Sequence, residues 1–207
     1  GFHSQATREL IKARGLPVIE MWDLPEKPLG QVVGFSNFAA MEVIVAHLVE
    51  RGARKLAFVG ASEGGDLRGA ERRAGAIAAA QKLDLPDVAV LDAGEAPVSM
   101  RHGAQLAENM GQALLDYDAI VCVSDPVAFG VLSACKRMGF DVPAQLAITG
   151  FGHFEVAAIS EPRITTVDVE ARRIGEITAG MLTNMFDGDA VPRTAKVDVT
   201  LVVGGTT

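Results

Sequence analysis

The sequence predicts an α/β protein built on parallel, doubly wound sheets, and two observations carry this prediction. Short apolar runs rich in valine and isoleucine recur along the chain, and most lack the alternation of a half-exposed strand. Amphipathic stretches with helical spacing separate these runs. Strands that alternate with helices in this order form parallel sheets that helices cover on both faces.

Each element has its own signal in the sequence. The expected strands are Pro17–Met21, Gln31–Phe35, Lys55–Gly60, Asp87–Asp92, Asp118–Val123, Leu146–Phe151, Arg163–Val167 and Lys196–Val203. Residues 41–49 place their apolar side chains on one helical face, and so do residues 170–186. Gly15, Gly52 and Gly139 follow basic residues at the ends of helical patterns, as C-terminal caps do.

Composition narrows the classes of function. The 207 residues are 49% hydrophobic and carry a net charge of −7, so the chain can bury a core but lacks a basic surface for gripping nucleic acid. No apolar run reaches the roughly 20 residues of a membrane-spanning helix. Cys122 and Cys135 have no metal-ligand spacing, so we expect buried, reduced thiols of a cytoplasmic protein, with a disulfide or a reactive thiol as the alternative.

Catalytic signatures do not stand out in the sequence. The glycine-rich stretch Gly60–Gly65 lacks the ending of a P-loop and the spacing of a dinucleotide fingerprint, so it is either a plain strand-to-helix connection or an anion site. There is no Gly-x-Ser-x-Gly elbow, and the four histidines have no metal-ligand spacing. We therefore predict no enzyme activity, no metal and no cofactor.

Ligands of doubly wound sheets bind beyond the carboxyl ends of the strands, which directs attention to a few side chains. Arg72 lies three residues before Gly75, where a small residue lets two helices approach, so its guanidinium can reach a ligand. Arg68 and Arg73 are expected to be solvated cations. Trp22, the only tryptophan, is either a core residue or a flat platform for a sugar-like ligand.

The pair Ser124 and Asp125 follows a predicted strand and begins a helix, so either residue can cap that helix or contact a ligand. His3 and His153 lie in predicted loops, where a histidine is more often an ordinary surface residue than a ligand.

An ordered set of motifs resembles the regulators of the lactose-repressor (LacI/GalR) family. The motifs run in family order over essentially the whole chain: Phe2-His3-Ser4, residues 15–23, Val33-Gly34-Phe35-Ser36-Asn37, residues 52–60, Ser124-Asp125, Ile148-Thr149-Gly150-Phe151-Gly152 and Pro162–Val167. Within the family, Glu20-Met21-Trp22-Asp23 and the closing Gly204-Gly205 look most like the gluconate-repressor (GntR-type) branch.

The resemblance implies the two-lobed fold of type I periplasmic binding proteins. The N-terminal lobe would hold residues 1–35 and 169–198, and the C-terminal lobe residues 36–168 and 199–207. Family members begin earlier, with a helix-turn-helix DNA-binding domain and the first units of the N-terminal lobe, and both are expected to be missing here. The resemblance further implies a homodimer that binds operator DNA through the missing domain and has no contact with a membrane.

By the same resemblance, a small-molecule effector contacts side chains of both lobes. These residues are His3, Trp22, Arg72, Ser124, Asp125, Gly152 and His153. Many sugar-binding relatives carry an aspartate where this chain has Gly152, which favours an anionic effector, a sugar acid such as gluconate. The alternative is a periplasmic sugar-binding protein of an ABC transporter, which shares the fold.

Overall fold

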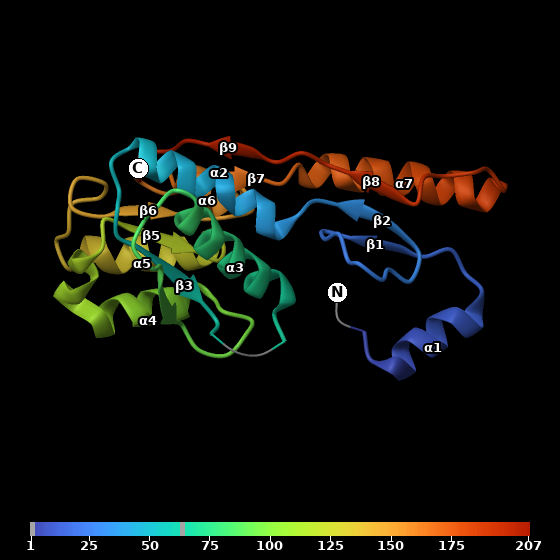
Figure 1. Cartoon of the computed structure of the whole chain (residues 1–207), viewed down its shortest axis with the longest axis horizontal. Helices are drawn as coiled ribbons and strands as arrows, with labels where there is room; N and C mark the ends of the chain where they lie inside the picture. The colour runs from blue at the N-terminus through green and yellow to red at the C-terminus, as the bar shows by residue number, and fades with distance from the viewer. Residues whose placement is uncertain (1–2, 63–64) are drawn as a thin grey trace. The chain divides into compact units, whose positions relative to one another are not determined.

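The computed structural model describes residues 3–62 and 65–207 (Figure 1). Its contacts divide the chain into two compact units. Unit 1 is Gly1–Ser36 with Val169–Val199, and unit 2 is Asn37–Asp168 with Thr200–Thr207. The chain therefore passes between the units at three places, after Ser36, Asp168 and Val199.

A four-stranded parallel sheet forms the centre of unit 2, in the order β4-β3-β5-β6. These strands are β3 (Leu56–Gly60), β4 (Ala89–Asp92), β5 (Ala119–Cys122) and β6 (Ala147–Thr149). Phe58 of β3 pairs with Val90 on one side and with Val121 on the other. Strands β3 and β5 are buried along their whole length, because helices cover both faces of the sheet.

The helices of unit 2 pack in two pairs. They are α2 (Asn37–Glu50), α3 (Leu67–Lys82), α4 (Met100–Met110), α5 (Asp125–Arg137) and α6 (Glu155–Ile159), with a 3₁₀ helix over Gly111–Asp116. Helix α2 packs on α3, and α4 packs on α5. Because β4 lies on one side of β3 while β5 and β6 lie on the other, right-handed crossovers place α3 on one face and α4 and α5 on the opposite face.

Glycine allows the close approach inside each pair. A Cβ on Gly75 of α3 would lie 2.2 Å from the carbonyl oxygen of Phe38 in α2. A Cβ on Gly130 of α5 would lie 2.0 Å from the carbonyl oxygen of Met100 in α4. The expectation that Gly75 lets two helices pack closely is therefore confirmed.

The last strand departs from the sequence prediction. One strand was expected over Lys196–Val203, but the structure forms β8 (Thr194–Lys196) and β9 (Thr200–Val202) in different sheets. Strand β8 pairs with β2 in unit 1, whereas β9 pairs antiparallel with β7 (Thr166–Asp168) in unit 2. The chain crosses between the units in the interval, so the prediction of a single strand was wrong.

Unit 1 contains a three-stranded parallel sheet in the order β1-β2-β8. Strands β1 (Ile19–Met21) and β2 (Gln31–Gly34) pack against α7 (Ala171–Asp187). Helix α1 (Gln5–Arg14) buries no residue completely.

Several local predictions are confirmed. Gly15, Gly52 and Gly139 all have positive φ, as C-terminal caps of helices require. Cys122 and Cys135 are buried and form no disulfide.

Part of the predicted glycine-rich loop, residues 63 and 64, lies outside the described residues, as does Phe2. Within the described residues no helix is both long and apolar enough to cross a membrane.

Candidate functional site

Five of the seven predicted site residues belong to unit 2 and gather near the carboxyl ends of its strands. Ser124 and Asp125 follow β5, and Gly152 and His153 follow β6. Arg72 lies on α3, the helix that follows β3, and it donates to the backbone just beyond β5. This is the edge where parallel sheets bind their ligands.

Arg72 is held by three groups of unit 2. Its Nε donates to Oδ1 of the fully buried Asn37 at 2.8 Å, and one terminal nitrogen donates to the carbonyl of Val123 at 2.8 Å. The guanidinium also stacks over the ring of Phe151, with Cζ 3.9 Å from the ring centroid. Such bracing fixes the direction of a long, half-buried cation before any ligand arrives.

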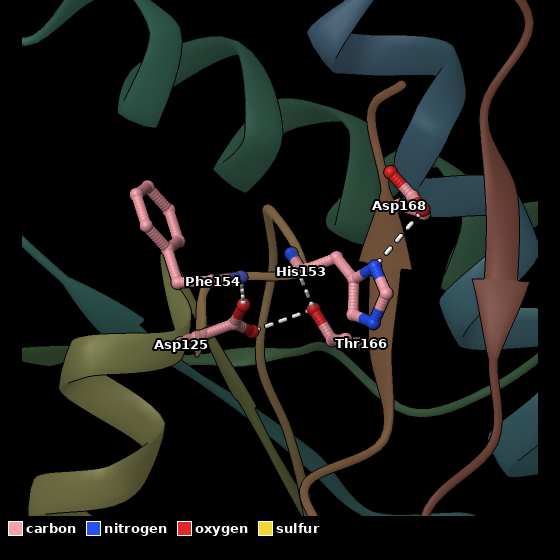
Figure 2. A network of polar contacts seen from close by, with 5 residues as sticks. All are labelled: Asp125, His153, Phe154, Thr166 and Asp168. Carbon is pink, nitrogen blue, oxygen red and sulfur yellow. Dashed lines mark hydrogen bonds and ion pairs between the residues drawn. The ribbon is translucent and has the colours of Figure 1, made fainter. Parts of the chain in front are cut away.

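Asp125 is the buried centre of a polar network at the same edge (Figure 2). Its Oδ2 accepts the backbone N–H of Phe154 at 2.7 Å, and its Oδ1 accepts the hydroxyl of Thr166 at 2.5 Å. Gly150 must lack a side chain here, because a Cβ would lie 2.1 Å from Asp125 Oδ1. The carboxylate thus joins the end of β5 to the loop after β6 and to the beginning of β7.

Burial controls the ionisation of this carboxyl group. Desolvation raises the pKa of Asp125 above its ordinary value, and the hydrogen bonds from Thr166 and Phe154 and the nearby His153 oppose that rise. The interpretation that Asp125 caps α5 does not match these bonds, because both oxygens accept from groups outside that helix. The side chain still lies in the first turn of α5, where the helix dipole favours a negative charge.

His153 is joined to Asp168 at the end of β7 (Figure 2). Its Nδ1 lies 2.9 Å from Asp168 Oδ2, which is a hydrogen-bonding distance. The backbone of His153 has a φ of 54°, an uncommon value for a residue other than glycine, and its N–H donates to Thr166. The ring's Nε2 has no partner among the described residues. The His153 side chain is therefore held by Asp168 near the carboxyl edge of the sheet, and its role in binding a ligand stays a prediction.

Gly152 and Ser124 complete this part of unit 2. Gly152 has a φ of 117°, and its N–H donates to Val167, which aligns the loop after β6 with β7. Ser124 precedes α5 in an extended conformation, yet its side chain makes no capping hydrogen bond. Its half-buried hydroxyl has no partner in the part of the chain that the structure describes.

The two predicted residues of unit 1 lie at the opening of α1 and at the end of β1. His3 Nε2 is 3.5 Å from Glu20 Oε1. Trp22 follows β1 with a φ of 73°, which a bulky residue rarely adopts, while its N–H donates to Val33. Gly34 accommodates this turn, because a Cβ there would lie 2.5 Å from the carbonyl oxygen of Asp23. The half-buried Trp22 is thus held in a strained conformation at a strand end.

Sequence reasoning missed the residues that support the site. The sequence assigns no role to the supporting residues, because their partners are distant along the chain. These residues are Asn37, Phe151, Thr166 and Asp168. Arg73 was expected to be a solvated cation, but it is half-buried and donates to the carbonyls at positions 61 and 62. That expectation was wrong because the arginine supports the loop that follows β3.

Two hollows of unit 2 differ in their relation to this edge. One of about 50 Å³ is lined by His153 and Arg163, and it is smaller than sites that hold sugar-sized ligands. A larger one of about 330 Å³ is lined by Arg51, Asp118 and Gln145, near the amino ends of the strands. Parallel sheets bind ligands at the opposite edge, so the larger hollow is not the candidate site. No group of three or more potential metal ligands occurs among the described side chains.

The fold and the position of the site define a class, the ligand-binding domain of the periplasmic binding protein type. Residues 45–207 match the family described as "Periplasmic binding protein-like domain". Two solved structures are similar over nearly the whole chain. A LacI family transcriptional regulator from Silicibacter pomeroyi is 34% identical with a TM-score of 0.87, covering 99% of this chain and 74% of that one. The transcription regulator GntR from Chromobacterium violaceum is 32% identical with a TM-score of 0.88, covering 100% and 75%.

The chain therefore belongs to the LacI family of transcriptional regulators, within the periplasmic binding protein-like domain class. The HTH-type transcriptional regulator GntR of Escherichia coli K12 is 30% identical over 98% of this chain. MalR of Streptomyces coelicolor is 25% identical over 100% of it. The chain spans 60% of the length of GntR and 62% of MalR.

Proposed function

We propose that the chain is the effector-binding core of a DNA-binding repressor, and that the effector is a sugar acid such as gluconate. The observation that carries this proposal is the bracing of Arg72 at the carboxyl edge of the sheet. A guanidinium fixed by its own partners is suited to a carboxylate, because two planar groups then meet with little loss of side-chain entropy.

The surroundings of Arg72 favour an acid over a neutral sugar. The family resemblance places an aspartate of many sugar-binding relatives at the position of Gly152, which supplies no carboxylate here. Asp125 is buried and accepts hydrogen bonds from its own chain, and Asp168 is joined to His153. Ser124 and His153 add a hydroxyl and a ring nitrogen that have no partner among the described residues. These groups match the carboxylate and hydroxyls of a sugar acid.

The relatives favour a regulator over the solute-binding protein of a transporter, since GntR and MalR are named as transcriptional regulators. We infer a homodimer that binds paired operator half-sites through a DNA-binding domain outside this chain, in the cytoplasm. His3 and Trp22 of unit 1 remain predicted contributors to effector binding. Catalysis plays no part in this mechanism, because the effector acts by shifting a conformational equilibrium.

A thermal-shift panel on the full-length protein tests the ligand assignment. Gluconate at about 100 times its dissociation constant should add roughly 2.7 kcal/mol of stability, whereas glucose at the same concentration should add far less. Arg72→Ala should abolish the shift. Arg68→Ala is the matched control, because Arg68 is an exposed arginine of the same helix. A shift with neutral sugars only, or one that survives in Arg72→Ala, would contradict the assignment.

A further inference from the structure

Unit 2 has a second hollow, at the amino ends of its strands and apart from the proposed effector site. It measures about 330 Å³, which is within the range of sites that hold small molecules. Its walls come from the turn after α2, from Asp118 directly before β5 and from residues 143–145 ahead of β6. Because Ser124 and His153 follow β5 and β6, the two sites lie on opposite edges of the sheet.

The walls of the hollow are held by hydrogen bonds of the protein itself. The N–H groups of Arg54 and Lys55 donate to Asp118 Oδ2 at 2.7 and 2.8 Å, which fastens the turn after α2 to the residue before β5. Gln145 Oε1 accepts the N–H of Asp141 at 2.8 Å in the loop before β6. A ligand therefore meets walls whose shape is largely fixed in advance, which lowers the entropy lost on binding.

Two opposite charges line this hollow without pairing with each other. Arg51 is exposed, and its guanidinium makes no hydrogen bond or ion pair with another described residue. Asp118 directs Oδ2 to two backbone N–H groups, whereas its Oδ1 has no partner in the described ranges. The hollow thus offers one cationic group and one anionic oxygen, both available to a ligand.

Apolar side chains make up another part of the lining. Leu48 is completely buried at the end of α2, and Ala53 is 7% exposed in the turn that follows. Ala147, the first residue of β6, also lies against the hollow. A ligand that fills this part loses nothing by carrying a hydrocarbon group, and it removes apolar surface from water.

We propose that this hollow is a second small-molecule site, and that it binds a zwitterion with a small apolar side chain, such as a free α-amino acid. The carboxylate pairs with Arg51, the ammonium group with Asp118 Oδ1, and the side chain packs toward Leu48. An anion alone is repelled by Asp118, and a cation alone is repelled by Arg51. Since exposed ion pairs are individually weak, only a ligand with both charges gains enough from the hollow. This site goes beyond the proposed function and does not depend on it.

His47 provides a local reporter of occupancy. Its Nε2 lies 2.8 Å from Thr207 Oγ1, and Thr207 lines the hollow. Burial lowers the pKa of His47, and the charge of Arg51 lowers it further. A ligand carboxylate beside Arg51 changes the field at the imidazole, so the nuclear magnetic resonance signal of the His47 ring should respond. The His153 ring, on the opposite edge of the sheet, serves as the comparison.

Three probes of matched shape test the charge requirement in the full-length protein with labelled histidine. Leucine carries both charges, isocaproate lacks the ammonium group, and isoamylamine lacks the carboxylate. Each probe is titrated while the ring signals are recorded, and His47→Gln assigns the reporter. We expect leucine to shift the His47 signal, and to bind at least about fivefold more tightly than either single-charge analogue.

Two variants test the assigned residues. Arg51→Gln and Asp118→Asn should each weaken leucine binding by about fivefold. The asparagine keeps an oxygen for the two backbone N–H groups that Asp118 accepts, so the walls stay in place. Arg101→Gln and Asp87→Asn are the matched controls, because both residues are exposed and neither lines the hollow.

The outcomes separate this site from the effector assignment. A zwitterion site is refuted if leucine leaves the His47 signal unchanged, if isocaproate binds as tightly as leucine, or if Arg51→Gln binds leucine like wild type. Gluconate should not compete with leucine, because the two ligands are assigned to opposite edges of the sheet. If leucine binds as expected but the protein fails to respond to gluconate, the second site stands and only the proposed effector is wrong.

Discussion

Removing the Asp125 carboxylate tests whether the polar network at the strand ends is structural. The substitution Asp125→Ala deletes the acceptor of both the Phe154 N–H and the Thr166 hydroxyl. Thr166 is completely buried, so its hydroxyl cannot turn to solvent instead. Asp125→Asn keeps the shape and one carbonyl oxygen, and its amide can donate to the oxygen of Thr166.

The expected magnitude follows from the groups left without partners. Two donors lose their acceptor, and each costs about 1 to 3 kcal/mol, so Asp125→Ala should lower the free energy of unfolding by about 2 to 6 kcal/mol. The Asn variant should lose less than half of that amount, because it leaves the network paired. Asp87→Ala, at an exposed site, should have an effect within about 0.5 kcal/mol of zero.

The pH dependence of stability provides a second, independent test of the role of Asp125. Because burial raises the folded-state pKa of Asp125 above 3.8, the folded protein retains a proton that the unfolded chain releases. The contribution of Asp125 to stability is therefore fully present below pH 3.8 and is lost as pH rises through the folded-state pKa. The deficit of Asp125→Asn relative to wild type should accordingly be larger near pH 4 than near pH 7.

Urea denaturation followed by circular dichroism at both pH values measures these differences. A stabilising role of the Asp125 network is refuted if Asp125→Ala is as stable as wild type, or if the stability deficit of Asp125→Asn grows as pH rises.

Three further predictions concern residues outside the candidate site. Gly75→Ala should destabilise the protein by about 1 to 3 kcal/mol in urea denaturation, because its Cβ meets the backbone of α2. The control Gly180→Ala, whose Cβ meets nothing within 4 Å, should stabilise the protein by about 0.5 to 1 kcal/mol. Equal effects of the two variants would contradict the close approach of α2 and α3. Burial, and to a smaller extent the charge of Arg51, lowers the pKa of His47 below 6.5, so the contribution of its neutral form to stability should decline as pH falls below 6.5. His47→Gln should flatten that part of a plot of stability against pH, and an unchanged plot would exclude His47 as the cause. Thr149→Val should raise the melting temperature, since it removes a buried hydroxyl without a partner among the described residues at a gain of about 1 kcal/mol; a fall in melting temperature would show that the hydroxyl is satisfied in solution.

The sequence was sufficient to predict the alternation of strands and helices, because that information is local. Strand β3 lies within one residue of its predicted bounds. Its five consecutive residues are all buried, as expected for a strand that is covered on both faces. The run Lys196–Val203 shows why non-local pairing is harder to predict. Its apolar residues continue without a turn signal, yet its two ends pair with strands of different units.

The candidate site was predictable only in its chemistry. Arg72 could be selected from its position near a strand end and from Gly75, but its partner Asn37 lies 35 residues away. The bond between His153 and Asp168 depends on strand pairing and on a positive φ at a residue that is not glycine. Neither feature leaves a pattern in the sequence. Capping of α5 by Asp125 was a reasonable local interpretation that tertiary hydrogen bonds replaced.

A crystal structure of the full-length protein grown with gluconate would show whether Arg72 binds the effector. We expect gluconate at the carboxyl edge of the unit 2 sheet, with its carboxylate within hydrogen-bonding distance of Arg72 and its hydroxyls near Ser124 and His153. Gluconate seated instead in the hollow of about 330 Å³ beside Arg51 and Asp118, or without contact to Arg72, would contradict it.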